Sequence, residues 1–268
     1  MSLPPPAPGS TCLVTGASSG IGAEVARALG RRGQGVTLVA RRAERLEELA
    51  SELSAEHGVR AEIIAGDMST TAGRGEVVAE IGRRRLQIEV LVNNAGFGSG
   101  GRFQELDRER EVEMVALNVE AVVDLCGRLV PEMAARGRGA VLNVASSAAF
   151  QPLPRQATYG ATKAFVLSFT DALTSDLAGT GVTATALCPG PVRTEFMESS
   201  GLSEEGKSVP SFLWTDADFV AEEGVKGLER GKRVVVPGRL TAAGTLAGQH
   251  APRGLLLKAL GWITPAGR

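Results

Sequence analysis

Tyr159 and Lys163 are the two residues whose types and spacing most directly suggest chemistry. Tyr159 is the single tyrosine of the 268-residue chain, and only 5 of the 29 basic residues are lysines. Residues at positions i and i+4 of a helix share one face, so the two side chains can meet. A tyrosine phenol ordinarily has a pKa near ~10. A neighbouring ammonium group favours the phenolate, so we expect Lys163 to lower the pKa of Tyr159 and prepare it for proton transfer.

A glycine-rich turn near the start of the chain has the composition of a phosphate-binding loop. It follows a short apolar run at residues 11–15 and precedes a stretch with helical spacing at residues 20–32. Glycines let the backbone approach a pyrophosphate, and the free N–H groups at a helix start favour an anion. A plain tight turn is the alternative, but the strand–turn–helix order favours dinucleotide binding. The candidate residues are Gly16, Ser18, Ser19, Gly20, Ile21 and Gly22.

Two arginines, Arg41 and Arg42, follow the second apolar run at residues 36–40. A site for NAD usually places an acidic residue here to hold the ribose 2′-hydroxyl, whereas arginine suits the 2′-phosphate of NADP. The alternative is that both arginines simply begin a surface helix, where basic residues oppose the helix dipole. We therefore predict NADP(H) as the cofactor, with an NAD-dependent site as the rival.

These residues need a scaffold, and apolar runs alternate with helical spacing along the whole chain. Strands that are apolar throughout are typical of a parallel sheet covered on both faces. The pattern predicts one α/β domain, a Rossmann-type doubly wound parallel sheet of about seven strands. A bend or break near Pro131 is expected in the longest helix. Expected strands are 11–15, 36–40, 60–65, 89–92, 140–145, 182–187 and 233–236; expected helices are 20–32, 43–57, 71–84, 108–136, 157–177 and 215–230.

The domain is expected to span residues 11–238, with a substrate lid at residues 189–214 that is rich in Gly, Ser and Pro. Residues 1–10 are proline-rich without the features of a secretion signal, and we expect a flexible tail. Residues 239–268 are expected to pack on the domain or on a second subunit. We expect the Leu-rich stretch at 254–263 to pack in the same way. The alternative is a weak peripheral contact with a membrane.

Composition excludes several classes of function. Lys and Arg total 29 against 30 Asp and Glu, and no basic stripe suggests a nucleic-acid partner. No apolar stretch reaches the roughly 18 residues of a membrane span. The two histidines are too few for a histidine metal centre, so no metal site is expected. Three separated cysteines in apolar runs indicate buried thiols in a reducing compartment, and we expect a cytoplasmic protein.

Several motifs occur together in one order and resemble the short-chain dehydrogenase/reductase family, classical type. Thr15 precedes the glycine turn, whose spacing is Gly-x-x-x-Gly-x-Gly. Ser146 stands thirteen residues before the Tyr159–Lys163 pair, which matches the family's Tyr-x-x-x-Lys. The remaining matches are the tetrapeptide Asn93-Asn94-Ala95-Gly96, Asn118 in the long helix, and Pro189-Gly190 after the sixth strand.

The resemblance implies a role for each catalytic residue. Tyr159 would exchange the proton, Lys163 would also bond the nicotinamide ribose, and Ser146 would hydrogen-bond the reacting oxygen. Asn118 would anchor a water that links Lys163 to solvent; the alternative is that Asn118 marks a mid-helix bend. Asp67 and Met68 resemble the family's adenine-edge pair, or Asp67 caps a helix from Ser69. The further cofactor residues implied are Asn94, Ala95, Gly96, Pro189, Gly190, Val192 and Thr194, besides Tyr159 and Lys163.

The expected function is hydride transfer between NADP(H) and a small-molecule carbonyl or alcohol. Apolar residues gather in three variable segments, 97–103, 150–154 and 193–214, which favours an apolar substrate or reflects lid packing alone. An apolar stripe on the 157–177 helix suggests a homodimer or homotetramer; burial against the sheet is the alternative. The rival function is an NADP-binding redox sensor or scaffold without turnover.

Overall fold

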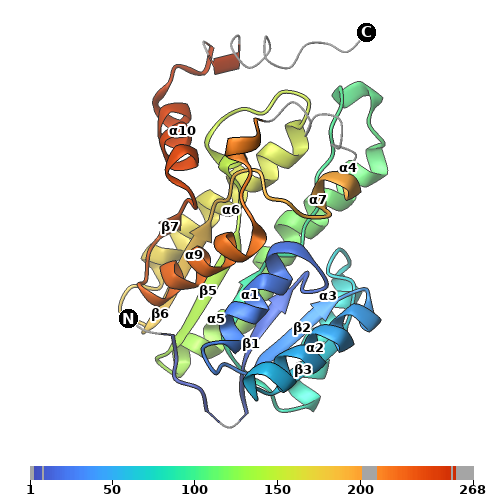
Figure 1. Cartoon of the computed structure of the whole chain (residues 1–268), viewed down its shortest axis with the longest axis vertical. Coiled ribbons are helices and arrows are strands. Elements are labelled where there is room, and N and C mark those ends of the chain that lie inside the picture. The colour runs from blue at the N-terminus through green and yellow to red at the C-terminus, as the bar shows by residue number, and fades with distance from the viewer. Residues whose placement is uncertain (1–2, 8, 201–209, 255, 258–268) are drawn as a thin grey trace.

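A seven-stranded parallel sheet forms the centre of the molecule, in the order β3-β2-β1-β4-β5-β6-β7 (Figure 1). The computed structural model describes residues 3–7, 9–200, 210–254 and 256–257. The predicted fold class is confirmed. The strands are β1 Ser10–Thr15, β2 Val36–Ala40, β3 Ala61–Ala65, β4 Gln87–Asn93, β5 Gly139–Val144, β6 Val182–Leu187 and β7 Val234–Val235.

Helices cover both faces of this sheet. One layer consists of α1 (Gly20–Gly30), α2 (Ala43–His57) and α9 (Ala217–Glu229), and the other of α3 (Thr71–Arg83), α5 (Ala121–Ala135) and α6 (Ala157–Asp176). Shorter elements lie toward one end of the molecule (Figure 1). These are η1 (Phe103–Glu105), α4 (Arg108–Val115), η3 (Ser147–Phe150), α7 (Phe196–Ser199), η4 (Ser211–Leu213) and α10 (Arg239–His250).

The strand side chains alternate between two hydrophobic cores. In β1, Cys12 and Val14 pack with the α1, α2 and α9 layer, whereas Leu13 packs with the α3, α5 and α6 layer. All three side chains are fully buried. This is why the strand sequences are apolar throughout instead of alternating with polar residues. Cys12, Cys126 and Cys188 are buried free thiols, as predicted.

The longest predicted helix is interrupted at a different place from the one expected. The helix continues through Pro131, since buried neighbours such as Val130 and Met133 hold that turn against the core. The irregularity is instead a π-turn, η2 (Ala116–Glu120), in which the Ala121 N–H donates to the Ala116 carbonyl. A π-turn inserts one extra residue into the helix and often marks a functional site.

The N-terminal residues also differ from the flexible tail that we expected over residues 1–10. Leu3 and Pro4 are buried, and the Gln34 amide donates to the Pro4 carbonyl at 2.8 Å. Ser10 is already the first residue of β1. The cause is a contact across the fold, because Leu3 joins the core layer that also contains Val36.

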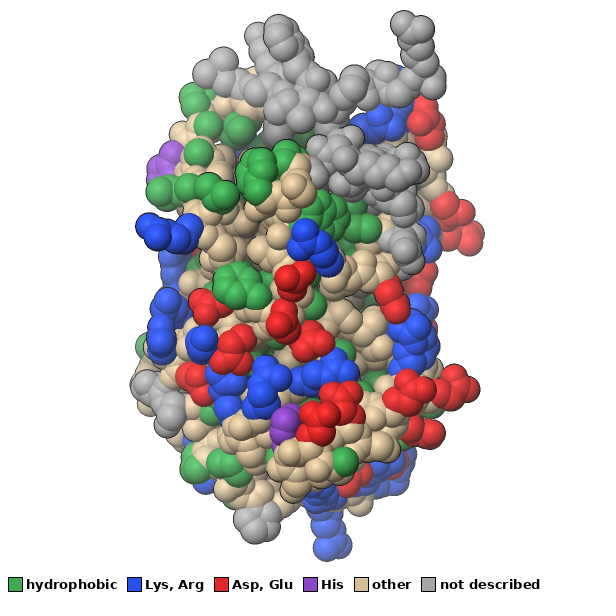
Figure 2. Space-filling view, viewed as in Figure 1, with side chains coloured by type: hydrophobic (Ala, Val, Ile, Leu, Met, Phe, Trp, Pro, Cys, Tyr) green, Lys and Arg blue, Asp and Glu red, His purple; other side chains and the backbone are tan. Residues whose placement is uncertain are grey.

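At the C-terminal end, residues 239–250 form α10, which packs beside η3. Most of the Leu-rich stretch at 254–263 lies outside the described residues. Within the described part of the chain, no helix combines the length and hydrophobicity that a membrane crossing requires. On the face shown in Figure 2, side chains of both charge signs are interspersed, many of them paired between neighbouring helices.

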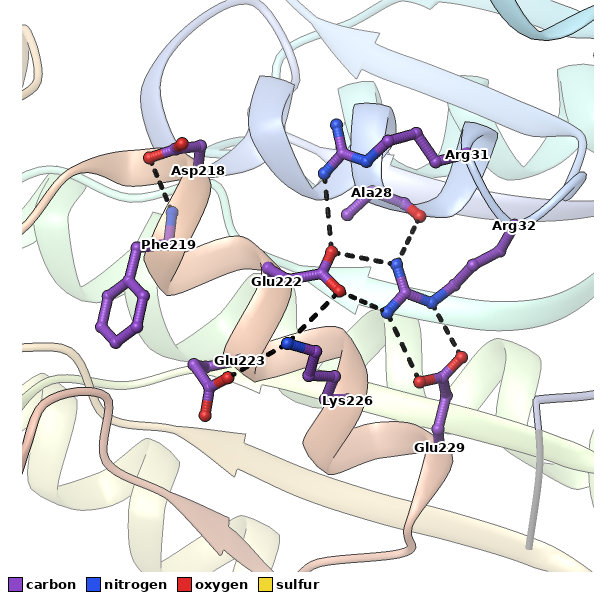
Figure 3. A network of polar contacts seen from close by, with 9 residues as sticks. All are labelled: Ala28, Arg31, Arg32, Asp218, Phe219, Glu222, Glu223, Lys226 and Glu229. Atoms are coloured by element: carbon purple, nitrogen blue, oxygen red, sulfur yellow. Dashed lines mark hydrogen bonds and ion pairs between the residues drawn. The ribbon is translucent and has the colours of Figure 1, made fainter.

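An ion-pair network fastens α1 to α9 (Figure 3). The Arg32 guanidinium donates to both oxygens of Glu222 at 2.8 and 3.1 Å, and to Glu229 at 2.8 Å. Arg31 and Lys226 also face Glu222. The hydrogen bonds from Arg32 lower the pKa of Glu222 to about 2. The network therefore joins the first helix of the chain to the last helix of the sheet layer.

We predict that Glu222→Gln destabilises the protein at neutral pH by about 1–2 kcal/mol, a value discounted for partial exposure. Because folding lowers the carboxyl pKa, the stabilisation is present above pH ~4.5 and is lost as the pH falls toward ~2. Denaturant unfolding of both proteins at pH 7 and pH 3 measures this. A difference that stays constant between the two pH values would contradict the assignment.

Candidate active site

A cleft of about 750 Å³ opens where the strand order reverses between β1 and β4. In doubly wound sheets this reversal is the usual ligand-binding position. Three of the predicted site residues, Gly22, Asp67 and Asn118, do not line it. Those that do are Gly16, Ser18, Ser19, Gly20, Ile21, Arg41, Arg42, Met68, Asn94, Ala95, Gly96, Ser146, Tyr159, Lys163, Pro189, Gly190, Val192 and Thr194.

The glycine turn is pinned against the end of β4. The Thr15 hydroxyl accepts hydrogen bonds from the backbone N–H groups of Asn94 and Ala95 at 3.0 and 3.1 Å. The Asn94 side-chain amide donates to the Thr15 carbonyl at 2.9 Å. Gly16 has φ +66°, and a Cβ there would lie 2.8 Å from the Asn94 amide nitrogen. Only glycine therefore fits this turn.

Gly22 has a packing role instead of a direct contact with a ligand. A Cβ on this residue would lie 2.4 Å from both the Gly16 carbonyl oxygen and the Asn94 amide nitrogen. The start of α1 is therefore pressed onto the turn, with the helix N-terminus aimed at the cleft. This arrangement of a glycine turn and a helix start fits a dinucleotide pyrophosphate, since it offers backbone donors without side-chain obstruction.

Arg41 and Arg42 have different surroundings. Arg42 donates to the Ser18 hydroxyl at 3.0 Å and to the Ser19 hydroxyl at 2.9 Å, and it pairs with Glu195. In the described part of the chain, Arg41 forms no ion pair within 4.0 Å. The guanidinium groups and the Ser18 hydroxyl are the donors that a ribose 2′-phosphate at this position requires.

Asp67 does not cap the helix that follows it, and its role at the adenine edge stays a prediction. Its carboxylate accepts from the Ser69 N–H at 2.9 Å and from the Ser69 hydroxyl at 2.8 Å, which forms a local turn. The N-cap of α3 is Thr70, whose hydroxyl accepts from the Gly73 N–H at 3.0 Å. The interpretation of Asp67 as the N-cap of a helix from Ser69 was wrong, because α3 begins at Thr71 and Thr70 caps it.

Ser146, Tyr159 and Lys163 meet in the cleft. Ser146 follows β5 and caps η3, and its hydroxyl is hydrogen-bonded to the Tyr159 phenol. Lys163 lies on the buried side of α6, with its amine 5.8 Å from the centre of the Tyr159 ring. The amine donates to the Val144 carbonyl at 2.9 Å. The end of β5 thus holds both partners of the tyrosine.

The electrostatics of this group differ from the expectation. Burial raises the pKa of Tyr159 to about 12, and the hydrogen bond with Ser146 offsets only part of this. Burial also lowers the pKa of Lys163 to about 8. The predicted lowering of the Tyr159 pKa by Lys163 is therefore wrong for this arrangement, because the amine binds Val144 and not the phenol oxygen. The tyrosine is a neutral phenol, which can donate a proton.

Asn118 lies in the π-turn, fully buried, and clamps the chain that follows β4. Its side chain accepts from the Phe97 N–H at 3.2 Å and donates to the Phe97 carbonyl at 3.0 Å. It also donates to the Thr162 hydroxyl, one residue before Lys163. The helix irregularity and the polar role therefore coincide. The water implied by the family resemblance remains a prediction.

The substrate end of the cleft contains polar residues that the sequence did not reveal. Arg110 and Glu113 project from α4, and the Arg110 guanidinium lies 4.9 Å from the centre of the Phe97 ring. Their i, i+3 spacing was a weak signal, because it is also typical of an exposed helix. Gln151 and Gln156 also line the cleft, as does Glu195, which pairs with Arg42 at the other end.

Comparison with known proteins identifies the family. A sequence model described as short chain dehydrogenase matches residues 10–205. The chain belongs to the short-chain dehydrogenase/reductase family. A sulfoacetaldehyde reductase 2 from Chromohalobacter salexigens is 37% identical over 186 residues, covering 69% of this chain and 73% of the relative.

Two solved structures of dehydrogenases resemble most of the fold. The short-chain dehydrogenase from Sphingobium yanoikuyae in complex with NADPH is 33% identical, with a TM-score of 0.80 over 92% of this chain and 95% of that one. The bulky-bulky ketone specific alcohol dehydrogenase from Comamonas testosteroni is 31% identical, with a TM-score of 0.77 over 92% and 93%. The protein is thus an oxidoreductase of the short-chain type that acts on a small molecule by hydride transfer.

Burial of the Lys163 ammonium group is expected to cost stability. Lys163→Met should raise the free energy of unfolding at pH 7 by about 1–3 kcal/mol, after loss of the bond to Val144 is included. Because folding lowers the lysine pKa, the cost to the wild type is complete below pH ~8 and disappears as the pH rises toward ~10.5.

Denaturant unfolding at pH 7 and pH 9.5 measures this difference. Lys226→Met is the matched control, because Lys226 lies on the surface of α9 and pairs only with neighbouring carboxylates. A Lys163→Met protein that is less stable than the wild type at pH 7 would show that the ammonium group is not penalised.

Proposed function

We propose that the protein is an NADP(H)-dependent carbonyl reductase that acts on an apolar ketone or aldehyde. The observation that carries this proposal is the meeting of Ser146, Tyr159 and Lys163 in the same cleft as the glycine turn. A protein that only binds or senses a dinucleotide has no use for a proton donor at this position.

The two hydroxyl groups have distinct tasks. The Ser146 hydroxyl holds the substrate carbonyl oxygen, and the Tyr159 phenol donates a proton to that oxygen as it becomes an alcohol. When bound, the nicotinamide supplies the hydride to the carbonyl carbon. Lys163, held by the Val144 carbonyl, offers its remaining donors toward the nicotinamide ribose. The raised pKa of Tyr159 keeps the proton on the phenol at neutral pH, as a proton donor requires.

NADP(H) is favoured over NAD(H) by the end of β2. Arg41 and Arg42 both line the cleft, and no acidic residue occupies the position that would hold a ribose 2′-hydroxyl. The Sphingobium yanoikuyae neighbour holds NADPH, which supports the same assignment here. Met68 and the backbone of Ala95 and Gly96 would border the adenine and nicotinamide halves of the cofactor.

An apolar substrate is supported by the cleft wall. Phe196 in the proposed lid lies 5.6 Å from the Tyr159 ring, centre to centre. Not every aromatic residue of the variable segments contributes, because Phe103 and Phe212 are 65% and 69% exposed and lie outside the cleft. Residues 201–209 of the proposed lid lie outside the described residues. The apolar residues that line the cleft include Phe97, Leu117, Leu153, Phe196 and Met197.

A homo-oligomer is supported by apolar side chains on the outer side of α4, α5 and α6. Phe165 is 42% exposed and stacks on Phe169, whereas the sheet-facing side of α6 carries Lys163 and Val166. The alternative, burial of the stripe against the sheet, holds for Leu177, which lies in the core, and for Phe169 and Leu173, which pack against it, but not for Phe165. Exposed valines on the adjoining helices extend this surface, namely Val112, Val115 and Val123.

Replacing Tyr159 by Phe tests the chemistry. Tyr159→Phe keeps the ring against Phe196 but removes the proton, and loss of a general acid costs about 10²-fold to 10⁴-fold in rate. We expect turnover of a ketone panel with NADPH, followed by nicotinamide absorbance, to fall by that factor. NADPH affinity should change by less than about 2-fold, since the phosphate contacts are untouched. Near wild-type turnover would place the proton donor elsewhere.

Replacing Arg41 by Ala tests the cofactor assignment. Loss of one charge-assisted hydrogen bond to the 2′-phosphate should weaken NADPH binding by about 1.5–3 kcal/mol and leave NADH almost unchanged. Fluorescence titration of the purified protein with each dinucleotide measures this. Arg60→Ala, on the surface beside Glu62, is the control for loss of one positive charge. Equal weakening of both dinucleotides would overturn the assignment.

A further inference from the structure

Glu195 connects the loop after β6 to the beginning of α2. Its carboxylate accepts hydrogen bonds from Arg45 at 2.6 Å and from Arg42 at 3.0 Å. These hydrogen bonds hold the pKa of the Glu195 carboxyl below its ordinary value, so the group is ionised at neutral pH. The two elements are some 150 positions apart in the sequence, and this carboxylate is the bridge between them.

The position of Glu195 places it beside the cofactor cleft. The preceding residue, Thr194, lies over the glycine turn, where a Cβ on Gly20 would be 3.1 Å from its methyl carbon. The following residue, Phe196, contacts the ring of Tyr159. Glu195 lines the cleft itself. A negative charge therefore lies at the end of the cleft that the proposed function assigns to the phosphates.

Arg42 is shared between this carboxylate and the glycine turn. Its guanidinium donates to Ser18 and Ser19 while it pairs with Glu195. A phosphate that approaches Ser18 and Arg41 meets an arginine whose charge is already neutralised by Glu195. A ribose 2′-hydroxyl carries no charge and leaves that pair intact.

We propose that Glu195 sets the preference between the two dinucleotides, as the anion that a 2′-phosphate must replace on Arg42. This inference rests on the proposed function, because it assumes that the cleft binds NADP(H). When a 2′-phosphate replaces the Glu195 carboxylate on Arg42, the carboxylate keeps its shorter hydrogen bond to Arg45. Arg45 is therefore its second binding partner. NADPH binds more weakly than Arg41 and Arg42 alone would allow, whereas NADH is unaffected.

Glu195→Gln tests the inference, because it keeps the shape of the side chain and removes the charge. We expect the dissociation constant of NADPH to decrease by about 3-fold to 5-fold, the scale of one exposed ion pair, with that of NADH changed by less than about 2-fold. Fluorescence titration of the purified full-length protein at low salt measures both. Raising the salt concentration should shrink the difference, because these charges are exposed to solvent.

Glu44→Gln is the matched control. Glu44 is an exposed carboxylate in the first turn of α2, between Arg42 and Arg45 in the sequence, and no ion pair of the described residues involves it. Glu44→Gln therefore removes one negative charge near the site without releasing Arg42 from its ion pair. We expect no change in NADPH binding beyond about 2-fold.

Arg45→Gln tests the role of this second binding partner of Glu195. Without Arg45 the carboxylate depends on Arg42 alone, so the phosphate displaces it less easily. NADPH should bind about 3-fold more weakly than to the wild type, and the double variant Arg45→Gln with Glu195→Gln should recover most of that loss. If the effects of Arg45→Gln and Glu195→Gln on NADPH binding simply add, the proposed exchange of anions on Arg42 is contradicted.

The outcomes separate the inference from the proposed function. NADPH binding that is unchanged or weakened by Glu195→Gln overturns the inference alone, since the wild type still binds NADPH. An equal gain from Glu44→Gln overturns it as well, because charge in general would then be the cause. A wild type that binds neither dinucleotide overturns both proposals.

Discussion

The hydrogen bonds that tie the end of β1 to the end of β4 are the constraint on which the site depends. One threonine hydroxyl, Thr15, accepts from two successive N–H groups, and one amide, Asn94, returns a bond to the β1 backbone. This pairing fixes the two strand ends at the point where the sheet order reverses. The glycine turn, the start of α1 and the Ala95–Gly96 backbone then have only one arrangement, and the cleft forms between them.

A second group of hydrogen bonds connects these strand ends to the catalytic residues. Asn118 holds the backbone of Phe97 on one side and Thr162 on the other, so the chain after β4 is attached to α6. Lys163 is anchored to the last residue of β5. Each bond uses a buried polar group that must find a partner, because an unsatisfied one is costly. The polar interior thus determines the geometry of the site more strictly than the apolar core does.

The sequence predicts much of this structure, because apolar periodicity and glycine turns act locally. All seven strands lie within a few residues of their expected positions, and most of the predicted site residues line one cleft. The failures concern effects that act across the fold. The pKa of Tyr159 depends on burial, and the bridge at Glu195 depends on two arginines far away in the chain. The burial of Leu3 likewise depends on a core that no local pattern describes.

The single tyrosine has a consequence for spectroscopy. Ionisation of a phenol changes its ultraviolet absorption, and in most proteins several tyrosines contribute to that signal. In this chain the whole tyrosine signal arises from Tyr159, inside the cleft and beside Ser146. An ultraviolet difference spectrum is therefore a label-free optical reporter of the reacting group. It shows the protonation state of that one phenol directly, in the unmodified protein and during a reaction.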